Sequence, residues 1–410
     1  MSDKVEMKKT NIGLIPIDWE VKKIEDISKN VFAGATPSTR NSEYWNGDIP
    51  WMSSGEINKK FIWSTEKKIT KEGFNSSSTK MVPKDSVLVA LAGQGKTRGT
   101  VAMNKIELCT NQSLASIVPD DTIEPKFLYY NLDSRYDELR KMSTGDGGRG
   151  GLNLKIINYI SIGIPPLGEQ KKIANILSTW DQAIVLKEKL IEQKKEQKKG
   201  IMQKILTGAV RLPGFDGEWK NVKLGKLIKE VNNKSTENNQ FQVLSVTKNG
   251  IVAQSEHFNK QVASDNNIGY KIIRKNNLVF STMNLWMGSL DVLTNFEIGI
   301  VSPAYKVFEF NRNRLNPTFG KYFMKAEHMI WIYNVNSEQG ASIVRRNLDL
   351  KGLLNTNIKV PSIEEQMEIA NLLSCVDKEI DLLEEETVEI KKQKKGLMKL
   401  LLTGKIRVKV

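Results

Sequence analysis

The chain contains one stretch twice: EQKKIANILSTWDQAIVLKEKLIEQKKEQKKGIMQKILTG at residues 169–208 and EQMEIANLLSCVDKEIDLLEEETVEIKKQKKGLMKLLLTG at residues 365–404. The copies align without a gap, about 196 residues apart, and share Glu-Gln, Ile-Ala-Asn, one Asp, Lys-Lys-Gly and Leu-Thr-Gly. Solenoid repeats have periods of roughly 20 to 50 residues, so this spacing excludes a solenoid. The pattern indicates a duplicated module, each consisting of one globular domain followed by one long helix.

Both copies carry the signals of a long helix. Residues 362–365, Ser-Ile-Glu-Glu, fit a capping box, in which Ser362 accepts a hydrogen bond from the first turn and Glu365 reaches back. The first copy has Pro166 at the helix entrance instead. Gly208 and Gly404 stand where a left-handed C-terminal cap belongs. At 1.5 Å per residue, each copy predicts a rod roughly 60 Å long.

Apolar residues recur at alternating four- and three-residue steps along both copies, which is the spacing of a coiled-coil seam. We assign these seam positions to helix pairing: Ile173, Leu177, Trp180, Ile184, Ile369, Leu373, Val376 and Ile380. A single rod would leave its seam exposed to water, whereas the second copy supplies a partner of equal length. The alternative, that each helix packs only on its own domain, is less favoured because such a rod exceeds a small domain's diameter.

Charge complementarity favours an antiparallel pair. The second helix is acidic early, at Glu379, Asp381 and residues 384–386, whereas the first helix carries lysines in its middle and later part. Antiparallel packing brings these stretches face to face, so that they can pair across the seam. It would also place the two globular domains at opposite ends, related by a pseudo-twofold axis.

The globular part of each module is predicted to be β-rich. Strands are expected at residues 86–91 and 277–280, each preceded by a turn (residues 80–85 and 271–276) and followed by a glycine-bearing loop. Further strands are expected at residues 114–118 and 304–308. Short helices with proline in the first turn should cover residues 124–130 and 316–322.

The expected fold class is therefore α+β. Two β-rich α/β globular domains are joined by two long antiparallel coiled-coil helices in a pseudo-twofold duplicated arrangement. We place the domain boundaries at 1–164 for the first globular domain, 165–208 for the first helix, 209–360 for the second domain and 361–410 for the second helix.

The composition favours a polyanionic partner. The chain has 61 Lys and Arg residues against 47 Asp and Glu, a net charge of +14 and a pI near 9.4, a balance typical of nucleic-acid-binding proteins. A lysine-rich surface from an AT-biased genome is the alternative. Cys109 and Cys375 are far apart, which argues against a disulfide framework or a cysteine metal site. No apolar run approaches a membrane span and the N-terminus lacks a signal peptide's apolar core, so we expect a cytoplasmic protein.

Catalytic motifs are weak throughout. Residues 91–97 end like a phosphate-binding loop, but the first glycine is replaced by Ala90 and the following residues are β-like. Residues 32–35 and 316–319 faintly resemble motifs of adenine methyltransferases, although Asn316-Pro317 aligns with Glu124-Pro125 of the other module, so a scaffold role explains it. His257 and His328 have no ligand partners at useful spacing, so neither catalytic nor metal-binding residues are predicted.

Basic and amide residues in non-helical stretches remain as DNA-binding candidates. Arg reads guanine and Asn or Gln reads adenine, while Lys contacts phosphates. The candidates are Gln94, Lys96, Arg98, Asn111, Gln112 and Arg149 in the first module and Trp286, Arg345 and Arg346 in the second. For each one taken singly, a solvated surface role is the alternative.

Together these features resemble the specificity subunits of Type I restriction-modification systems. The resemblance covers essentially the whole chain and rests on the doubled Pro-x-x-x-Glu-Gln-x-x-Ile-Ala-Asn helix entrance and the doubled Lys-Lys-Gly-x-Met…Leu-Thr-Gly exit. Residues 48–57 and 299–305 also resemble target-recognition segments of that family.

The resemblance implies a DNA-binding protein without catalytic residues. Each of two target-recognition domains would read one half of a bipartite, asymmetric DNA site, and the helices would act as a spacer and as the dock for two modification (adenine methyltransferase) subunits. Restriction subunits would join the full complex. The chain itself would bind no cofactor, because S-adenosylmethionine is expected on the modification subunits.

Two other classes of function remain open at this stage. A standalone DNA adenine methyltransferase would bind S-adenosylmethionine itself. A scaffold would use its coiled coil only to join proteins and would bind no DNA.

Overall fold

The structure is a computed structural model that describes residues 5–93, 97–142, 151–247, 250–257, 266–339 and 346–409. The chain divides into two compact units. Unit 1 combines Met1–Glu188 with Glu385–Val410, and unit 2 comprises Lys189–Glu384. Each unit therefore holds one globular domain, part of the first long helix and part of the second. The four segment boundaries expected from the sequence stay predictions.

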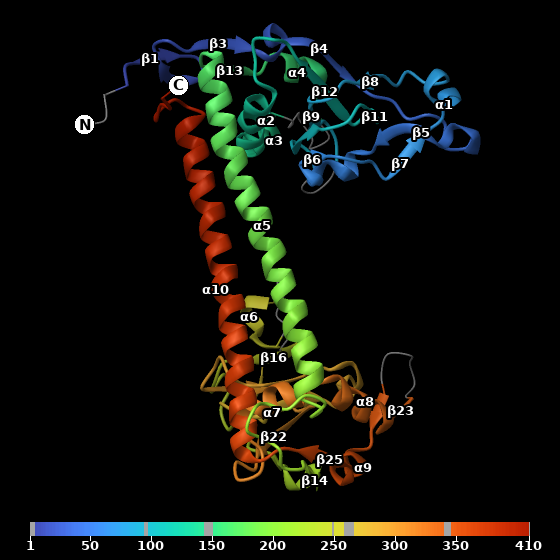
Figure 1. Cartoon of the computed structure of the whole chain (residues 1–410), viewed down its shortest axis with the longest axis vertical. Coiled ribbons are helices and arrows are strands. Elements are labelled where there is room, and N and C mark those ends of the chain that lie inside the picture. The colour runs from blue at the N-terminus through green and yellow to red at the C-terminus, as the bar shows by residue number, and fades with distance from the viewer. Residues whose placement is uncertain are drawn as a thin grey trace. The chain divides into compact units, whose positions relative to one another are not determined.

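The globular domain of unit 1 is built on two small sheets (Figure 1). The five-stranded sheet has the order β4 (Ser28–Ala33), β12 (Leu114–Pro119), β9 (Val87–Ala90), β10 (Val101–Asn104) and β6 (Phe61–Ile62). The four-stranded sheet has the order β7 (Lys67–Ile69), β5 (Trp45–Met52), β11 (Leu108–Thr110) and β8 (Met81–Val82). The remaining strands form two antiparallel pairs, β1 (Met7–Thr10) with β2 (Gly13–Pro16) and β3 (Glu20–Lys23) with β13 (Ser161–Ile164).

The short helices of unit 1 are α1 (Lys71–Asn75), α2 (Pro125–Ser134), α3 (Tyr136–Met142) and α4 (Leu154–Asn158). Among them, α1, α2 and α4 contact strands of these sheets. Pro125 occupies the first turn of α2, as the sequence predicts. Phe127, Leu128, Tyr129 and Tyr130 of α2 are all buried, so this helix carries much of the domain's core.

Unit 2 repeats the plan with a four-stranded antiparallel sheet. Its order is β15 (Ile228–Val231), β22 (Tyr305–Phe310), β19 (Leu278–Ser281) and β20 (Leu290–Val292). Four antiparallel pairs complete the strands: β14 (Lys220–Lys223) with β25 (Asn357–Val360), β16 (Leu244–Thr247) with β17 (Gly250–Ala253), β18 (Lys271–Arg274) with β21 (Ile298–Val301), and β23 (Ser337–Gln339) with β24 (Arg346–Leu348). The helices are α6 (Gln254–His257), α7 (Pro317–Phe323), α8 (Glu327–Val335) and α9 (Leu350–Asn355).

The turns expected at residues 80–85 and 271–276 are partly wrong. Each stretch begins with a strand, β8 or β18, and only its last residues turn. The turns contain Asp85 at φ 64° and Asn276 at φ 70°, the left-handed conformation that Asp and Asn tolerate. The two strands were not predicted because a run of two to four residues is too short to show the alternation of apolar and polar residues.

The two long helices are α5 (Leu167–Ile205) and α10 (Ile363–Leu401), which confirms the two predicted rods. Gly208 and Gly404 follow them with φ of 73° and 67°, so both helices end at a left-handed glycine as expected. The predicted capping box is half correct. Ser362 Oγ accepts from the Glu365 amide over 3.3 Å, but the Glu365 carboxylate bonds to Arg211 and Trp219 of the same unit.

The two helices lie side by side and antiparallel within each unit (Figure 1). In unit 1, Lys187 pairs with Glu386 and Lys391 with Glu188. In unit 2, Lys194 pairs with Glu379, Lys195 with Glu384 and Lys198 with Asp377. Residue numbers rise along one helix as they fall along the other, and the expected charge complementarity is realised.

The seam residues enter the core of their own unit. Ile173 and Leu177 of α5 share one buried cluster with Met398 and Leu401 of α10 in unit 1. In unit 2 a second cluster joins Ile369 and Leu373 of α10 to Ile205 of α5. Ile184 and Ile380 are also buried, whereas Trp180 and Val376 are half-buried. Both clusters also contain residues of the globular domain, so the assignment of these eight residues to helix pairing stays a prediction.

Candidate nucleic-acid interface

Three segments of unit 1 meet beyond the carboxyl end of β9. The Leu91 amide donates to the Ser113 carbonyl over 2.8 Å, which holds the β9–β10 connection against the segment between β11 and β12. A Cβ on Gly151 would lie 3.3 Å from the Leu91 carbonyl oxygen, so the chain returns here after the glycine-rich stretch. Arg98, in the β9–β10 connection, is half-buried. The fold thus brings together loops from three distant parts of the sequence.

The predicted pair Asn111 and Gln112 lies at this junction. Asn111 is half-buried, and its Oδ1 accepts from the Ser113 amide over 3.3 Å, while its Nδ2 donates to Ser54 Oγ over 3.5 Å. Gln112 is exposed, and its Oε1 accepts from Thr36 Oγ1 over 2.7 Å. Asn111 therefore shapes the turn, and Gln112 is the more accessible of the two amides. Gln94, Lys96 and Arg149 lie outside the described residues.

In unit 2 the structure brings together two predicted residues that are distant in sequence. Trp286 belongs to a short 3-10 helix, Leu285–Met287, and Arg346 begins β24. The Arg346 guanidinium carbon stands 4.3 Å from the centroid of the Trp286 ring, and Nη1 donates to Asn334 Oδ1 on α8. Such a cation–π stack fixes the plane of the guanidinium. Asn334 was missed because nothing in the sequence distinguishes it from other helix-surface amides, and Arg345 lies outside the described residues.

The two candidate interfaces occupy equivalent places in the duplicated scaffold. β9 and β19 each pair with the strand before a proline-started helix, β12 and β22 respectively. The loop with Arg98 follows β9, and the turn with Trp286 follows β19. The same position of the fold thus carries different side chains in the two units.

The repeated Glu-Gln at each helix entrance is structural. Glu169 is buried and accepts from Trp19 Nε1 over 3.2 Å and from Arg407 over 2.7 Å. Arg407 also donates to Asp18, which lowers the pKa of that carboxyl. In unit 2, Glu365 accepts in the same way from Trp219 Nε1 over 3.2 Å and from Arg211 over 2.7 Å.

We call each buried glutamate with its arginine and tryptophan partners a glutamate clamp. The sequence analysis predicted no role for the two arginines of these clamps. Arg211 and Arg407 each follow Leu-Thr-Gly at the same spacing, Gly208-Ala-Val-Arg and Gly404-Lys-Ile-Arg, a signal in the repeat that could have found them. The arginine after each long helix therefore binds the first turn of the other long helix within its unit.

The glutamines attach each helix entrance to its globular domain. Gln170 Oε1 accepts from the Glu124 amide over 2.8 Å, and its Nε2 donates to the Pro165 carbonyl over 2.9 Å. Gln366 repeats this with the Asn316 amide over 2.8 Å and the Pro361 carbonyl over 3.0 Å. Both side-chain amides are thereby satisfied inside the protein.

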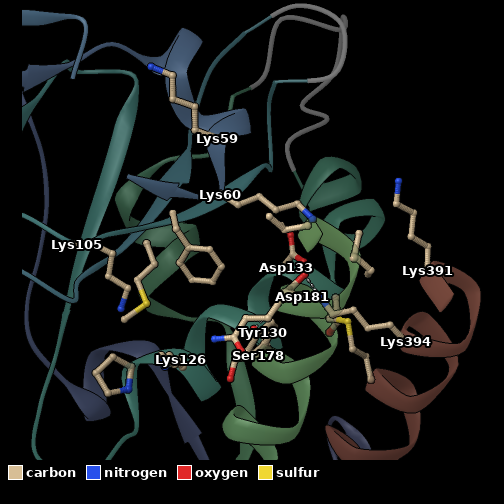
Figure 2. A pocket seen from close by; sticks show the side chains of 18 of the residues that line it. Lys59, Lys60, Lys105, Lys126, Tyr130, Asp133, Ser178, Asp181, Lys391 and Lys394 are labelled. Atoms are coloured by element: carbon tan, nitrogen blue, oxygen red, sulfur yellow. Dashed lines mark hydrogen bonds and ion pairs between the residues drawn. The ribbon is translucent and has the colours of Figure 1, made fainter. Parts of the chain in front are cut away.

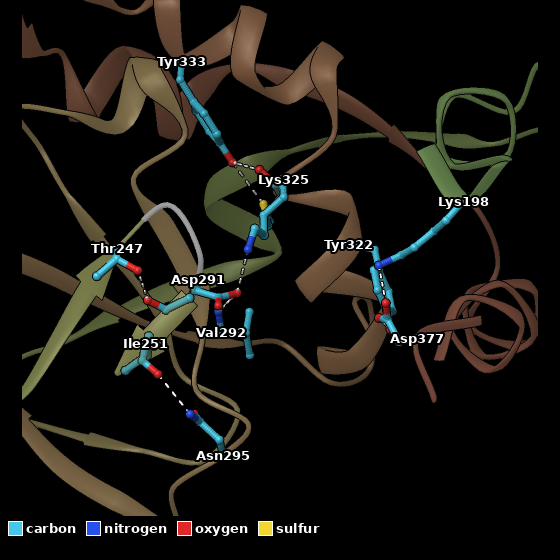
Figure 3. Close-up of polar contacts among 12 residues, drawn as sticks. Lys198, Thr247, Ile251, Asp291, Val292, Asn295, Tyr322, Lys325, Tyr333 and Asp377 are labelled. Carbon is cyan, nitrogen blue, oxygen red and sulfur yellow. Dashed lines mark hydrogen bonds and ion pairs between the residues drawn. The ribbon is translucent and has the colours of Figure 1, made fainter. Parts of the chain in front are cut away.

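The repeated Asp joins three elements in each unit. Asp181 on α5 accepts from Tyr130 of α2 over 2.8 Å and from Lys394 of α10 over 2.6 Å. Asp377 on α10 accepts from Tyr322 of α7 over 2.7 Å and from Lys198 of α5 (Figure 3). Burial, reinforced by the neighbouring carboxylate, raises the pKa of both tyrosines, so each remains a hydrogen-bond donor.

The faint methyltransferase motifs have structural explanations. Asn316 caps α7, its Oδ1 accepting from the amides of Thr318 and Phe319 over 2.9 and 3.1 Å. A Cβ on Gly34 would lie 1.9 Å from the Thr110 carbonyl oxygen, so this glycine permits a close backbone contact. Both residues serve the scaffold.

Within the described residues, no group of three or more His, Cys, Asp or Glu side chains is arranged to hold a metal ion. His328 is half-buried, and burial lowers its pKa. None of the described helices is both long enough and apolar enough to cross a membrane.

Comparison with known proteins gives consistent relatives. A family model described as the Type I restriction modification DNA specificity domain matches residues 16–195. The MjaIX specificity subunit of Methanocaldococcus jannaschii is 36% identical over 206 residues, which cover 49% of this chain and 45% of that protein. The match therefore spans about half the length of this relative. The MjaVIII specificity subunit of the same organism is 26% identical over 427 residues, covering 96% of this chain and 94% of that protein.

Solved structures share the fold along the whole chain. The HsdS subunit from Thermoanaerobacter tengcongensis has a TM-score of 0.54 and 15% identity, covering 97% of this chain and 100% of that one. The S subunit of a type I restriction-modification system from M. genitalium has a TM-score of 0.52 and 14% identity, covering 98% and 99%. At these identities the likeness concerns the fold alone.

Proposed function

We propose that this chain is a type I restriction-modification specificity subunit, the DNA-recognition subunit of such a complex, and that it reads a bipartite and asymmetric target. The observation that carries the asymmetry is the pair of candidate interfaces, which occupy equivalent positions of a duplicated scaffold but present different side chains. Each unit would read one half-site, and because the readers differ, the half-sites differ.

In unit 2 the proposed base reader is Arg346, held by Trp286. An arginine whose plane is fixed can donate two parallel hydrogen bonds to the O6 and N7 atoms of guanine in the major groove. In unit 1 the proposed readers are Gln94, Lys96, Arg98, Asn111, Gln112 and Arg149. In unit 2, Arg345 is proposed as a reader together with Arg346. The net charge of +14 supports sequence-independent attraction to phosphates.

The chain supplies recognition, and its partners supply the chemistry. Two modification subunits would carry S-adenosylmethionine and methylate adenine, and restriction subunits would join the full complex. The cytoplasm, where the host DNA lies, is the proposed place of action.

The test is selection of bound duplexes from a random pool by the complex of this chain with its modification subunit. We expect one bipartite sequence to be enriched, with two unlike halves. Arg346→Ala should relax one base pair of one half-site at a cost of about 1–3 kcal/mol per position, while Arg312→Ala, an exposed arginine of the same unit, should leave the selected sequence unchanged.

Two outcomes would overturn the proposal. Enrichment of no sequence would favour a scaffold that only joins proteins. Stoichiometric binding of S-adenosylmethionine by the isolated chain would favour a standalone methyltransferase.

A further inference from the structure

One helix lies against the candidate DNA-binding loop in each unit. In unit 1 this helix is α3, and a Cβ on Gly99, in the loop after β9, would lie 3.3 Å from both Arg140 Cγ and Leu139 Cβ. In unit 2 it is α8, and a Cβ on Gly288, in the turn after β19, would lie 3.2 Å from Ile330 Cδ1. The two glycines have φ of 79° and 81°, so both loops turn alike where they meet the helix. The duplicated scaffold therefore brings a second element to each candidate interface.

In unit 2, α8 exposes an apolar face beside the arginine that we propose as a base reader. Trp331 is 65% exposed and Val335 is 62% exposed. Asn334 shares this face, because residues three apart on a helix are neighbours, and its Oδ1 accepts a hydrogen bond from Arg346 Nη1. Trp331 thus lies one helical turn from the residue that holds Arg346. Since tryptophan is ordinarily well buried, an indole this exposed indicates a binding surface.

The composition of α8 favours contact with base edges over contact with phosphates. The helix, Glu327–Val335, contains no Lys or Arg, and phosphates are bound mainly by basic side chains. The carboxylate of Glu327 at its start would repel them. In the major groove, apolar side chains instead recognise the C5-methyl group of thymine. The continuity of this face with Arg346 favours DNA over a protein surface as its occupant.

The corresponding helix of unit 1 has a different surface. α3 carries two acidic and two basic residues, and Tyr136 and Asp137 at its start line a cavity of about 1500 Å³ within unit 1. Figure 2 shows this cavity, in which Asp181 accepts hydrogen bonds from Tyr130 and Lys394. α8 instead presents an indole to the surface. The two helices therefore differ between the units, as the two loops do.

We propose that Trp331 reads the methyl group of a thymine within about two base pairs of the guanine that Arg346 reads. Neighbouring side chains on a helix have Cβ atoms about 5–6 Å apart, and consecutive base pairs are about 3.4 Å apart. The contacts of Arg346 and Trp331 should accordingly fall on adjacent or nearly adjacent base pairs. The inference rests on the proposed function and adds to it a specificity-determining residue and the base that this residue recognises.

The test uses the complex of this chain with its modification subunit, and the duplex sequence that this complex selects. In the half-site that Arg346→Ala alters, each thymine is replaced in turn by deoxyuridine, which lacks only the methyl group. One replacement, close to the guanine, should weaken binding by the wild-type complex about threefold to fivefold, the effect of one buried methyl group. The same replacement should leave binding by the Trp331→Ala complex unchanged, because the methyl group has then lost its apolar partner.

Trp63 offers a matched control. This tryptophan of unit 1 is 68% exposed, so Trp63→Ala makes the same chemical change in the other unit. The Trp63→Ala complex should keep the full effect of the deoxyuridine replacement in the half-site that Arg346 reads. Unchanged selection of the other half-site by the Trp331→Ala complex would show that this variant is folded.

The inference alone is overturned if that half-site has no thymine near the guanine, or if no replacement weakens binding by the wild-type complex. It is also overturned if the effect persists in the Trp331→Ala complex. Loss of the modification subunit from the Trp331→Ala complex would overturn it as well, because α8 would then bind protein. A wild-type complex that selects no DNA sequence would contradict the proposed function and the inference with it.

Discussion

Glu169 shows how single residues hold this protein together. Its carboxylate is buried and accepts hydrogen bonds from Trp19 and Arg407. Trp19 belongs to the N-terminal segment of unit 1, and Arg407 belongs to its C-terminal segment. The bonds are charge-assisted and bidentate, the strongest geometry available to a carboxylate. A buried carboxylate that loses its arginine is left without compensation for its lost hydration.

We therefore predict that Arg407→Ala destabilises unit 1 by about 3 kcal/mol or more, because it leaves Glu169 buried and unpaired. Denaturant unfolding of the full chain measures this loss. Lys405→Ala, a neighbouring exposed lysine, should change stability by less than about 0.5 kcal/mol. Equal stability of the two variants would show that the clamp contributes little.

His328 gives unit 2 a pH dependence. Burial lowers the pKa of its imidazole below the ordinary 6.5, and its Nδ1 is buried with no hydrogen-bond partner in the described part of the chain. Between the folded and the unfolded pKa, the unfolded chain binds more protons than the folded one, so stability falls as pH drops through 6.5.

We expect unfolding midpoints measured between pH 7.5 and 5.5 to fall more steeply for the wild type than for His328→Gln, which cannot take up the proton. The difference should appear below a pH of about 6.5 and stop growing below the folded pKa. Parallel curves for the two proteins would contradict this assignment.

At the scale of elements, α5 and α10 are tied together by the aspartate that the repeat preserves. Asp181 and Lys394 are 16% and 8% exposed, so this ion pair lies largely out of water, and Tyr130 adds a third element through the same carboxylate. Asp377, Lys198 and Tyr322 repeat it in unit 2. By contrast Lys195 and Glu384 are about half exposed, and such pairs contribute roughly 0–1 kcal/mol.

A double-mutant cycle tests this distinction. Asp181→Ala and Lys394→Ala should each destabilise unit 1 by about 3 kcal/mol, and the double variant should lose less than the sum, giving a coupling energy of roughly 1–3 kcal/mol. The same cycle on Lys195 and Glu384 should give less than about 1 kcal/mol. Similar coupling energies in both cycles would mean that burial does not decide their strength.

The sequence predicted the elements whose residue pattern repeats over many residues. Both rods, their glycine ends and their charge pairing follow from local patterns repeated over about 40 residues, and the proline-started helices follow from one residue each. Strands such as β8 were missed because two residues carry no period. The sequence identified Arg346 and Trp286 as two separate candidates. It did not predict that they stack on each other, because that contact depends on the tertiary fold.

At the scale of the whole molecule, the duplication keeps the internal contacts of the two units alike and varies the loops that we propose read DNA. The residues that match best between the modules, Glu-Gln, the repeated Asp and the lysines that pair with it, form internal contacts, whereas the loops after β9 and β19 differ. If the paired helices set the distance between the half-sites, their length should appear in the DNA target.

Inserting one heptad into each long helix tests this spacer role. Seven residues keep the seam in phase and add about 10 Å, which corresponds to about three base pairs of duplex. We predict a target whose central spacer is longer by about that amount and whose two half-sites are unchanged. If the variant with both insertions folds but still selects the original spacer length, the helices do not set the distance between the half-sites.

The most direct test of the account is methylome sequencing of a host that produces this chain with its modification subunit. The account predicts methylated adenines in one asymmetric, bipartite motif, with Arg346→Ala altering only one of its halves. A palindromic or uninterrupted motif, or an Arg346→Ala change that alters both halves together, would contradict it.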